Sequence, residues 1–202
     1  MTAATDAYPV RFSVEYPEGP RDRLAVLLRP ILALPILVLL AVLSAPQVRT
    51  GGATISGGVA IAVMLMIVFR QKYPRWWFDW LVAVYRFSLR VSAYVLLLRD
   101  EYPSTDEEQA VHLSVEYPDA KQLNRWLPLV KWLLAIPHYL VLIVLIVVAL
   151  IATLVAWIAI LVTGHYPRGM FDFVAGVLSW GNRVSGYAFL LVTDVYPPFS
   201  LE

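Results

Sequence analysis

Two acid–base pairs recur in this sequence at the same spacing. Asp79 precedes Arg90 by eleven residues, and Asp172 precedes Arg183 by eleven residues. Eleven residues make about three helical turns, so each pair would lie nearly on one face of a helix. Ionisable groups next to lipid are costly and often mark an ion or substrate path. We favour a structural role, because a contact that holds a fold should occur in both copies, with the aspartate near a helix start and the arginine on phosphates or a strand.

The three histidines form no pattern typical of a metal site. His112, His138 and His165 have unrelated positions, and no two of them have the spacing of a helical metal-binding pair. We expect His138, which follows Pro137, to bond a carbonyl freed by that proline rather than to ligate haem or a metal. There is no cysteine, glycine-rich phosphate loop, nucleophile elbow or pair of catalytic carboxylates. We therefore predict no catalytic residue, no cofactor and no metal. A non-enzymatic protein is the favoured interpretation, and an enzyme that acts on a lipid or a membrane-bound substrate is the minor alternative.

Basic and aromatic residues flank the apolar segments. Bases at these positions can contact anionic lipid headgroups or simply set the topology. The candidate lipid contacts are Arg21, Arg23, Arg29, Lys121, Arg125 and Lys131. Tryptophans favour the headgroup layer. The expected interfacial anchors are Trp76, Trp77, Trp80, Trp126 and Trp132.

The composition indicates a bilayer as the solvent. Apolar residues make up 59% of the 202 residues and charged residues only 15%, whereas soluble proteins have roughly 45–50% and about 25%. Segments of about 20 apolar residues can cross the hydrocarbon core as helices. We predict four such helices. The net charge of +1 gives no indication of nucleic-acid binding.

The chain contains an internal repeat. The segment from Val10 to Pro17 returns 101 residues later as Val111 to Pro118, and Tyr73-Pro74-Arg75 returns 93 residues later. We expect two tandem parallel repeats, 1–105 and 106–202, in an integral membrane α-helical protein with small β additions. Each repeat would contain a strand, a transmembrane helical hairpin, an interfacial amphipathic helix and a second strand.

The expected elements of the two repeats correspond. The opening strands have period two, and we expect each to pair with its own repeat's closing strand. In the first repeat the ranges are 10–17 for the strand, 24–45 and 54–72 for membrane helices, 75–91 for the surface helix and 92–99 for the closing strand. In the second they are 111–117, 125–146, 149–165, 168–184 and 185–192. We expect the segment 24–45 to be retained rather than removed as a signal peptide.

The predicted hairpins contain a proline in each first helix, and the second hairpin has a very short turn. Pro35 and Pro137 predict a shared kink in the first membrane helix of each repeat. The second hairpin must turn between Val147 and Leu154, where Thr153 is the one polar side chain. We favour a hairpin that barely spans over a re-entrant tip, because an irregular turn in lipid leaves backbone groups unsatisfied.

The residues also resemble a known family. The carrying motifs are Val-x-x-Ser-Val-Glu-Tyr-Pro, residues 133–139, residues 163–173, Arg183-Val184-Ser185-Gly186-Tyr187 and the closing residues 196–199. They resemble the bacterial domain-of-unknown-function family 4389 over nearly the whole chain, and the second copy fits best. The resemblance implies a small bacterial integral membrane protein and no activity.

These observations lead to an expected function. We expect a multi-pass protein of the bacterial inner membrane with both termini in the cytoplasm, because four spans put all lysines and arginines but Arg49 on that side. Its partners would be membrane lipids and another integral membrane protein or itself. The first hypothesis is a non-catalytic accessory or scaffold subunit. The alternative is a small carrier, channel or lipid-handling protein that uses a pseudo-two-fold helix bundle.

Overall fold

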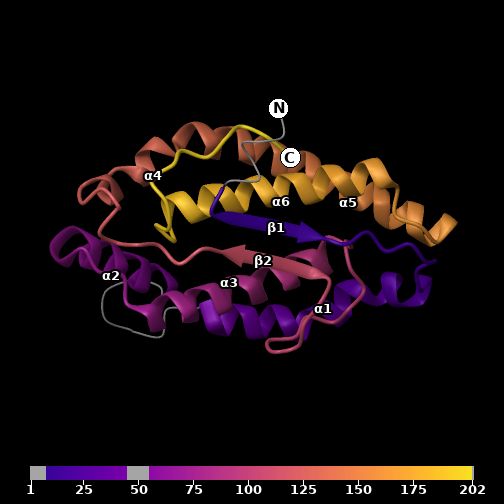
Figure 1. Cartoon of the computed structure of the whole chain (residues 1–202). Coiled ribbons are helices and arrows are strands. Elements are labelled where there is room, and N and C mark those ends of the chain that lie inside the picture. Colours follow the sequence, from indigo (N-terminus) through magenta and orange to yellow (C-terminus); the bar gives the residue numbers. More distant parts are fainter. Residues whose placement is uncertain (1–7, 45–54, 202) are drawn as a thin grey trace.

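The computed structural model describes residues 8–44 and 55–201, which are mostly helical (Figure 1). The long helices of the first half are α1 (Arg23–Ser44), α2 (Ile55–Arg70) and α3 (Arg75–Val95). The second half contains a 3-10 turn η2 (Leu127–Leu129) and the helices α4 (Lys131–Leu134), α5 (Ile136–Thr163) and α6 (Arg168–Ala188). The two strands are β1 (Val10–Val14) and β2 (Val111–Val115). The predicted turn at residues 46–54 lies outside the described residues.

The two predicted opening strands pair with each other. They form an antiparallel sheet in which Phe12 lies opposite Leu113. Alternation of apolar and polar residues puts Val10 and Leu113 on the covered face and leaves Arg11 and Ser114 exposed, as the period of two predicts. The expectation that each strand pairs with the closing strand of its own repeat is wrong.

The predicted closing strands, 92–99 and 185–192, are also wrong. Helix α3 continues to Val95 and α6 to Ala188, and each then ends in a turn. Phe87, Val91 and Tyr94 are all buried, which is the three-and-four spacing of a helix rather than the alternation of a strand. In the turns Leu97 and Leu191 adopt left-handed backbone angles, with φ of 62° and 55°.

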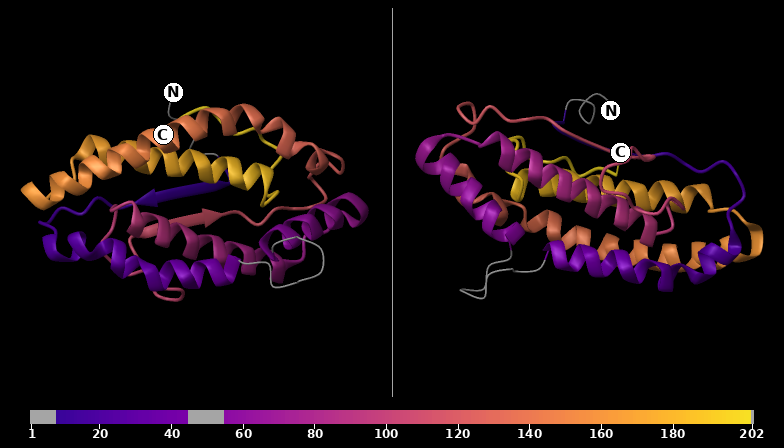
Figure 2. Two further views of the ribbon diagram at one scale, coloured as in Figure 1. Left: turned by 180° about the vertical axis from the view of Figure 1, so that it is seen from behind. Right: turned by 90° about the horizontal axis from the view of Figure 1, so that it is seen from below.

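The elements form three layers (Figure 2, right). The sheet lies on the amphipathic helices α3 and α6, and these lie on the apolar helices α1 and α5. The sheet therefore has one covered face and one exposed face. All three layers run along the long axis of the molecule.

The halves of the chain are exchanged across the sheet. Strand β1 packs on α6, and β2 packs on α3. The Tyr16 hydroxyl donates to the Tyr166 carbonyl at 2.6 Å, and the Tyr117 hydroxyl donates to the Tyr73 carbonyl at 2.5 Å. These are corresponding residues of the sequence repeat. Each opening strand is thus fixed to the opposite half of the chain.

A single helix replaces the predicted second hairpin. Helix α5 runs unbroken over 28 residues, so the ranges 125–146 and 149–165 are wrong as two antiparallel helices. Residues 138–163 contain no glycine or proline that would stop a helix. The Thr153 hydroxyl donates to the Ala149 carbonyl at 2.8 Å, so the one polar side chain at the expected turn is satisfied within the helix.

The two candidate kink prolines lie in different settings. Pro35 lies inside α1, together with Pro30. Pro137 lies in the first turn of α5, just after the break at Ala135 that separates α4 from α5. A proline is readily accommodated there because the first helical residues have no intrahelical acceptor for their N–H groups. In the second half the predicted kink is therefore a helix start.

Candidate functional site

The layer of α1 and α5 carries the largest apolar surface among the described residues. Both helices are long and apolar enough to cross a membrane. Each buries one stripe against the middle layer, for example Val26, Ala33 and Ile36 on α1. The remaining circumference exposes large apolar side chains, such as Val38 on α1 and Val144 on α5, each 62% exposed. We call these exposed side chains of α1 and α5 the α1/α5 face.

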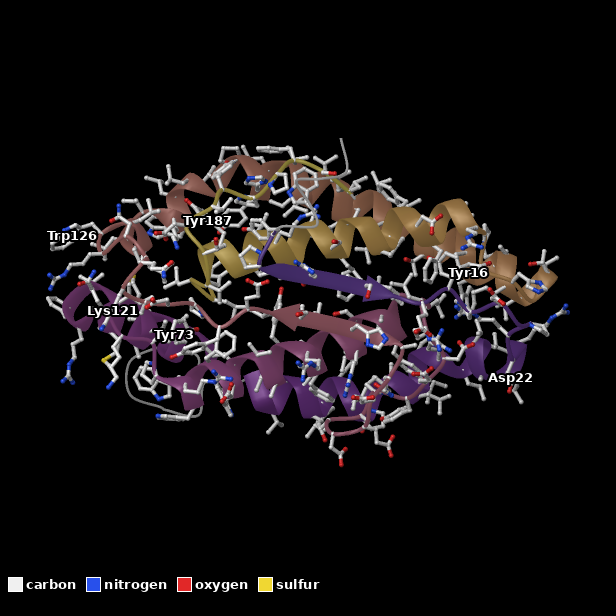
Figure 3. All side chains as sticks on the ribbon, viewed as in Figure 1. Tyr16, Asp22, Tyr73, Lys121, Trp126 and Tyr187 are labelled. Atoms are coloured by element: carbon white, nitrogen blue, oxygen red, sulfur yellow. The ribbon has the colours of Figure 1, made fainter. Side chains whose placement is uncertain are left out.

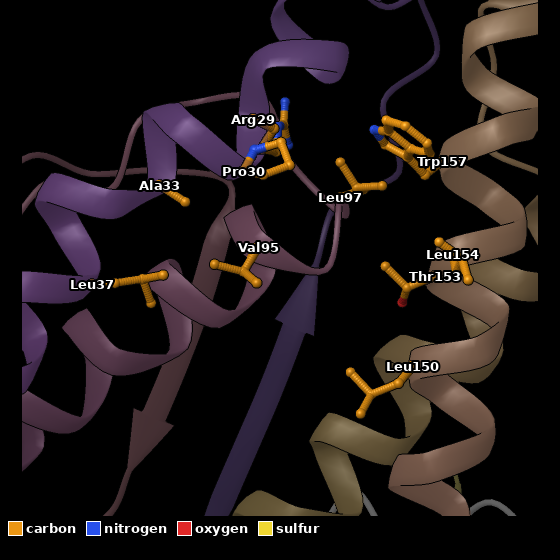
Figure 4. A pocket seen from close by; sticks show the side chains of 10 residues that line it. All are labelled: Arg29, Pro30, Ala33, Leu37, Val95, Leu97, Leu150, Thr153, Leu154 and Trp157. Carbon is orange, nitrogen blue, oxygen red and sulfur yellow. The ribbon is translucent and has the colours of Figure 1, made fainter.

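An apolar groove divides this face (Figure 4). It has a volume of about 520 Å³ and lies between α1 and α5, over the end of α3. Its walls are formed by Ala33, Leu37, Val95, Leu97, Leu150, Leu154 and Trp157, with Arg29, Pro30 and Thr153. The Trp157 indole donates to the Val26 carbonyl at 3.0 Å and so joins the two helices. A second hollow of about 330 Å³ shares Leu37, Val95 and Leu150 with it and continues the groove.

Two buried arginines fix the helices beside one end of the groove. Arg29 donates to the carbonyls of Tyr94 and Arg99 at 3.1 and 2.7 Å and pairs with Asp100. Arg21 donates to the Leu97 carbonyl at 2.6 Å and pairs with Asp100 at 3.0 Å. Burial lowers the pKa of Arg21 and the nearby Asp100 opposes that effect. The end of α3 and the turn after it therefore supply the acceptors for both guanidinium groups.

Lys131 makes the corresponding contact in the second half. Its ammonium group is fully buried, pairs with Asp194 at 2.7 Å and donates to the Thr193 carbonyl at 2.7 Å. Burial lowers the pKa of Lys131, and the hydrogen bond to Asp194 opposes this effect. The partners of Arg29 and Lys131, Asp100 and Asp194, begin the repeated Asp-x-Tyr-Pro motif. The motif therefore anchors the turn after the amphipathic helix to the helix that begins the next layer.

The six predicted lipid-binding bases do not form one cluster. Arg21, Arg29 and Lys131 are buried and bond to the protein. Arg125 donates to the carbonyls of Val68 and Phe69 at the end of α2. Arg23 and Lys121 are exposed near opposite ends of the molecule, where Asp22 and Lys121 are labelled (Figure 3).

The predicted Asp–Arg pairs are not formed. Asp79 pairs with Arg75 at 3.4 Å, and both side chains are exposed. Arg90 donates to the Ser104 carbonyl at 2.7 Å, and Arg183 donates to the Ser200 carbonyl. Asp172 is exposed. The two arginines therefore bind the segments that follow their helices. The spacing of eleven residues does not reflect an ion pair between aspartate and arginine.

The predicted tryptophan anchors are largely exposed, and His138 is not. Trp76, Trp126 and Trp132 expose more than half of their surface, Trp80 is 37% exposed and Trp77 is half-buried.

His138 is fully buried. Its Nδ1 accepts a hydrogen bond from the Trp180 indole at 3.1 Å, and its ring stacks on Phe199 at 3.9 Å. The partner is therefore an indole rather than the carbonyl we expected.

Several of these contacts could not be predicted from sequence patterns. The groove combines Leu97, Leu150 and Trp157 from distant segments, and no spacing rule relates them. The ion pairs Arg29–Asp100 and Lys131–Asp194 could have been predicted from the sequence repeat. A basic residue and an aspartate occupy equivalent positions in both halves.

Comparison with known proteins gives a family and no activity. No curated protein matches the chain and no solved structure matches it. Residues 126–200, which include α4, α5 and α6, match the model of the domain of unknown function DUF4389. The match does not extend to the first half, where the sequence also suggested the resemblance. Over residues 126–200 the chain is therefore similar to the DUF4389 family.

Proposed function

We propose that this protein is a non-catalytic integral membrane protein that serves as an accessory or scaffold subunit for another membrane protein. The observation that carries the proposal is the α1/α5 face, which the described chain leaves uncovered. Exposed apolar surfaces of this extent are typical of contact with lipid or with a partner. Within a bilayer both contacts are available to the same face.

The order of the layers supports a particular orientation. The exposed face of the sheet is polar, the middle helices are amphipathic and the α1/α5 face is apolar. This order follows the change from water through headgroups to hydrocarbon. A helix with its side chains is about 10–12 Å thick, which fits within one leaflet of about 15 Å, half of the hydrocarbon core. We therefore place α1 and α5 along the membrane, with the sheet on the cytoplasmic side.

An upright orientation is less favourable. It would put the exposed sheet face at membrane depth, where Arg11 faces Glu116 at 4.0 Å and His112 faces Glu15 at 3.6 Å. A charged side chain at the bilayer centre costs about 2.5–3.5 kcal/mol or more. Crossing by α1 and α5, as the multi-pass expectation requires, would therefore need a second subunit to cover the sheet.

Photo-crosslinking tests the partner. A photoreactive amino acid at Val144 would lie on the exposed side of α5, and the same residue at Ala156, which is fully buried, is the matched control. In native membranes we expect position 144 to give a discrete protein adduct that position 156 does not give. Adducts with lipid alone would contradict the scaffold role.

The groove favours a second candidate, a lipid-handling protein. It is lined by apolar side chains and opens on the same layer as the α1/α5 face, so an acyl chain matches its lining. The substitution Ala33→Trp would fill the groove between Arg29 and Leu37. If the protein transfers lipid between vesicles, we expect this variant to lose transfer while the control Val38→Trp, on the exposed side of α1, retains it.

A further inference from the structure

A polar cavity lies on the opposite side of α3 from the groove. It has a volume of about 550 Å³ and lies between α3, the edge of β2 and the segment before β2. Arg86 and Arg90 line it from α3, and Ser114 and His112 line it from β2. The remaining lining residues are Glu108, Gln109, Val111 and Leu113.

Two arginines and one acid line this cavity, and the carboxylates of Glu101 and Asp106 lie near Arg90 outside the lining. The two arginines are four residues apart on one helix, where like charges repel. No ion pair joins either of them to an acid within residues 8–44 and 55–201. Glu108 is the one acidic side chain in the lining, and His112 faces Glu15 instead.

Arg90 is the more constrained of the two. It is 7% exposed, its Nη1 donates to Ser104, and its Nε has no hydrogen-bond partner among the described residues. Arg86 is exposed and makes one long contact, 3.4 Å, to the Leu113 carbonyl. A buried guanidinium with an unused donor is costly unless an acceptor reaches it. The Nε of Arg90 is itself buried from solvent, so the donor that the cavity offers to a bound anion is the exposed guanidinium of Arg86, beside the charge of Arg90.

The second half of the chain does not repeat this arrangement. Arg183 corresponds to Arg90, but Ser179 occupies the place that corresponds to Arg86. Arg86 is therefore not needed for the contacts that the two halves share. A fold-holding role explains Arg90 and leaves Arg86 unexplained.

We propose that this cavity binds a phosphate group between Arg86 and Arg90. Paired guanidinium groups provide the charge-assisted hydrogen bonds that phosphate oxygens accept. The phosphate comes either from an anionic phospholipid headgroup or from a free anion. The headgroup source rests on the orientation proposed above, because α3 would then lie at headgroup depth, whereas binding of free phosphate does not.

The test uses the full chain in neutral detergent micelles and phosphorus NMR. One arm titrates inorganic phosphate, and the other adds phosphatidylglycerol to the micelles. The variant is Arg86→Gln, which removes an exposed side chain and should keep the fold. The control is Arg11→Gln, which removes the same charge from the sheet face outside the cavity. Thermal unfolding of both variants verifies the fold.

We expect saturable broadening of the phosphorus signal with the wild type and with the control. Arg86→Gln should weaken binding at least about tenfold, as loss of a charged hydrogen bond implies. Broadening by phosphatidylglycerol identifies the lipid as the source, and broadening by inorganic phosphate alone identifies a soluble anion. Equal binding by Arg86→Gln, or no saturable binding in either arm, would overturn the proposal, and neither result bears on the crosslinking at Val144.

Discussion

Replacement of Asp194 by asparagine isolates the most deeply buried charge of the described chain. Lys131 is fully buried, and Asp194, whose side chain is 26% exposed, is its one acidic partner within the described residues. The substitution Asp194→Asn keeps the size of the side chain and removes its charge. Lys131 then has no anionic partner and retains neutral contacts, namely the Thr193 carbonyl and the Tyr187 ring.

The expected loss of stability is about 3 kcal/mol. Removal of one partner of a buried pair costs about 3–5 kcal/mol, and the partial exposure of Asp194 favours the lower end. For a chain of this length, 1 kcal/mol shifts the Tm by about 2–4 °C. We therefore expect the Tm to fall by roughly 6–12 °C.

Unfolding in detergent, followed by intrinsic tryptophan fluorescence, measures this loss. The matched control is Asp172→Asn, because Asp172 is exposed and such surface changes stay within about 0.5 kcal/mol. Equal Tm values for the two variants would refute the role given to the Lys131–Asp194 pair.

The same variant has a predicted pH dependence. Burial already lowers the pKa of Lys131, and loss of Asp194 lowers it further. Native Asp194→Asn therefore releases the lysine proton at a lower pH than the unfolded chain does. The unfolded state binds more protons in that interval, so the stability of the variant rises with pH. The difference in Tm from the wild type should narrow as the pH rises through the alkaline range.

Two further predictions concern the exchanged strands. A Cβ at Gly186 would lie 2.5 Å from a methyl group of Val10, so Gly186→Ala should destabilise the protein by about 1–3 kcal/mol. Gly181→Ala, with nothing within 4 Å of the added carbon, should instead stabilise its helix by about 0.5–1 kcal/mol, and the reverse order of the two Tm values would contradict this packing. Tyr16→Phe and Tyr117→Phe each remove one hydrogen bond to a carbonyl and should each cost about 1 kcal/mol; unfolding measurements in which one variant is unaffected would argue against equivalent roles.

The sequence predicts local structure well where one period dominates. The alternation around Phe12 and Leu113 identifies both strands, and the apolar runs identify α1 and α2 within a few residues. Prediction from the sequence fails where the helical period of 3.6 and the strand period of two both fit the residues, as at 92–99. It also fails at Val147 to Leu154, where the length of an apolar run was interpreted as two crossings although no residue there stops a helix.

Contacts between distant segments were beyond any local pattern. Strand pairing within each repeat and pairing between repeats leave the same alternation in the sequence, so the exchange of β1 and β2 could not be chosen. The Asp–Arg spacing suggested a pair, but spacing along one helix says nothing about acceptors such as the Ser104 carbonyl. The cavity beside Arg86 could not be predicted for the same reason, because its lining residues come from α3 and from β2, which are distant in the sequence.

Cysteine accessibility in intact membranes tests the central claim most directly. The chain contains no cysteine, so Val144→Cys on the α1/α5 face and Ser114→Cys on the exposed sheet face each introduce a unique thiol. In inside-out vesicles, a membrane-impermeant maleimide should label position 114 at once and position 144 only after detergent is added. Rapid labelling of position 144 in intact vesicles, or protection of position 114, would contradict a protein that lies with α1 and α5 in the hydrocarbon and its sheet in the cytoplasm.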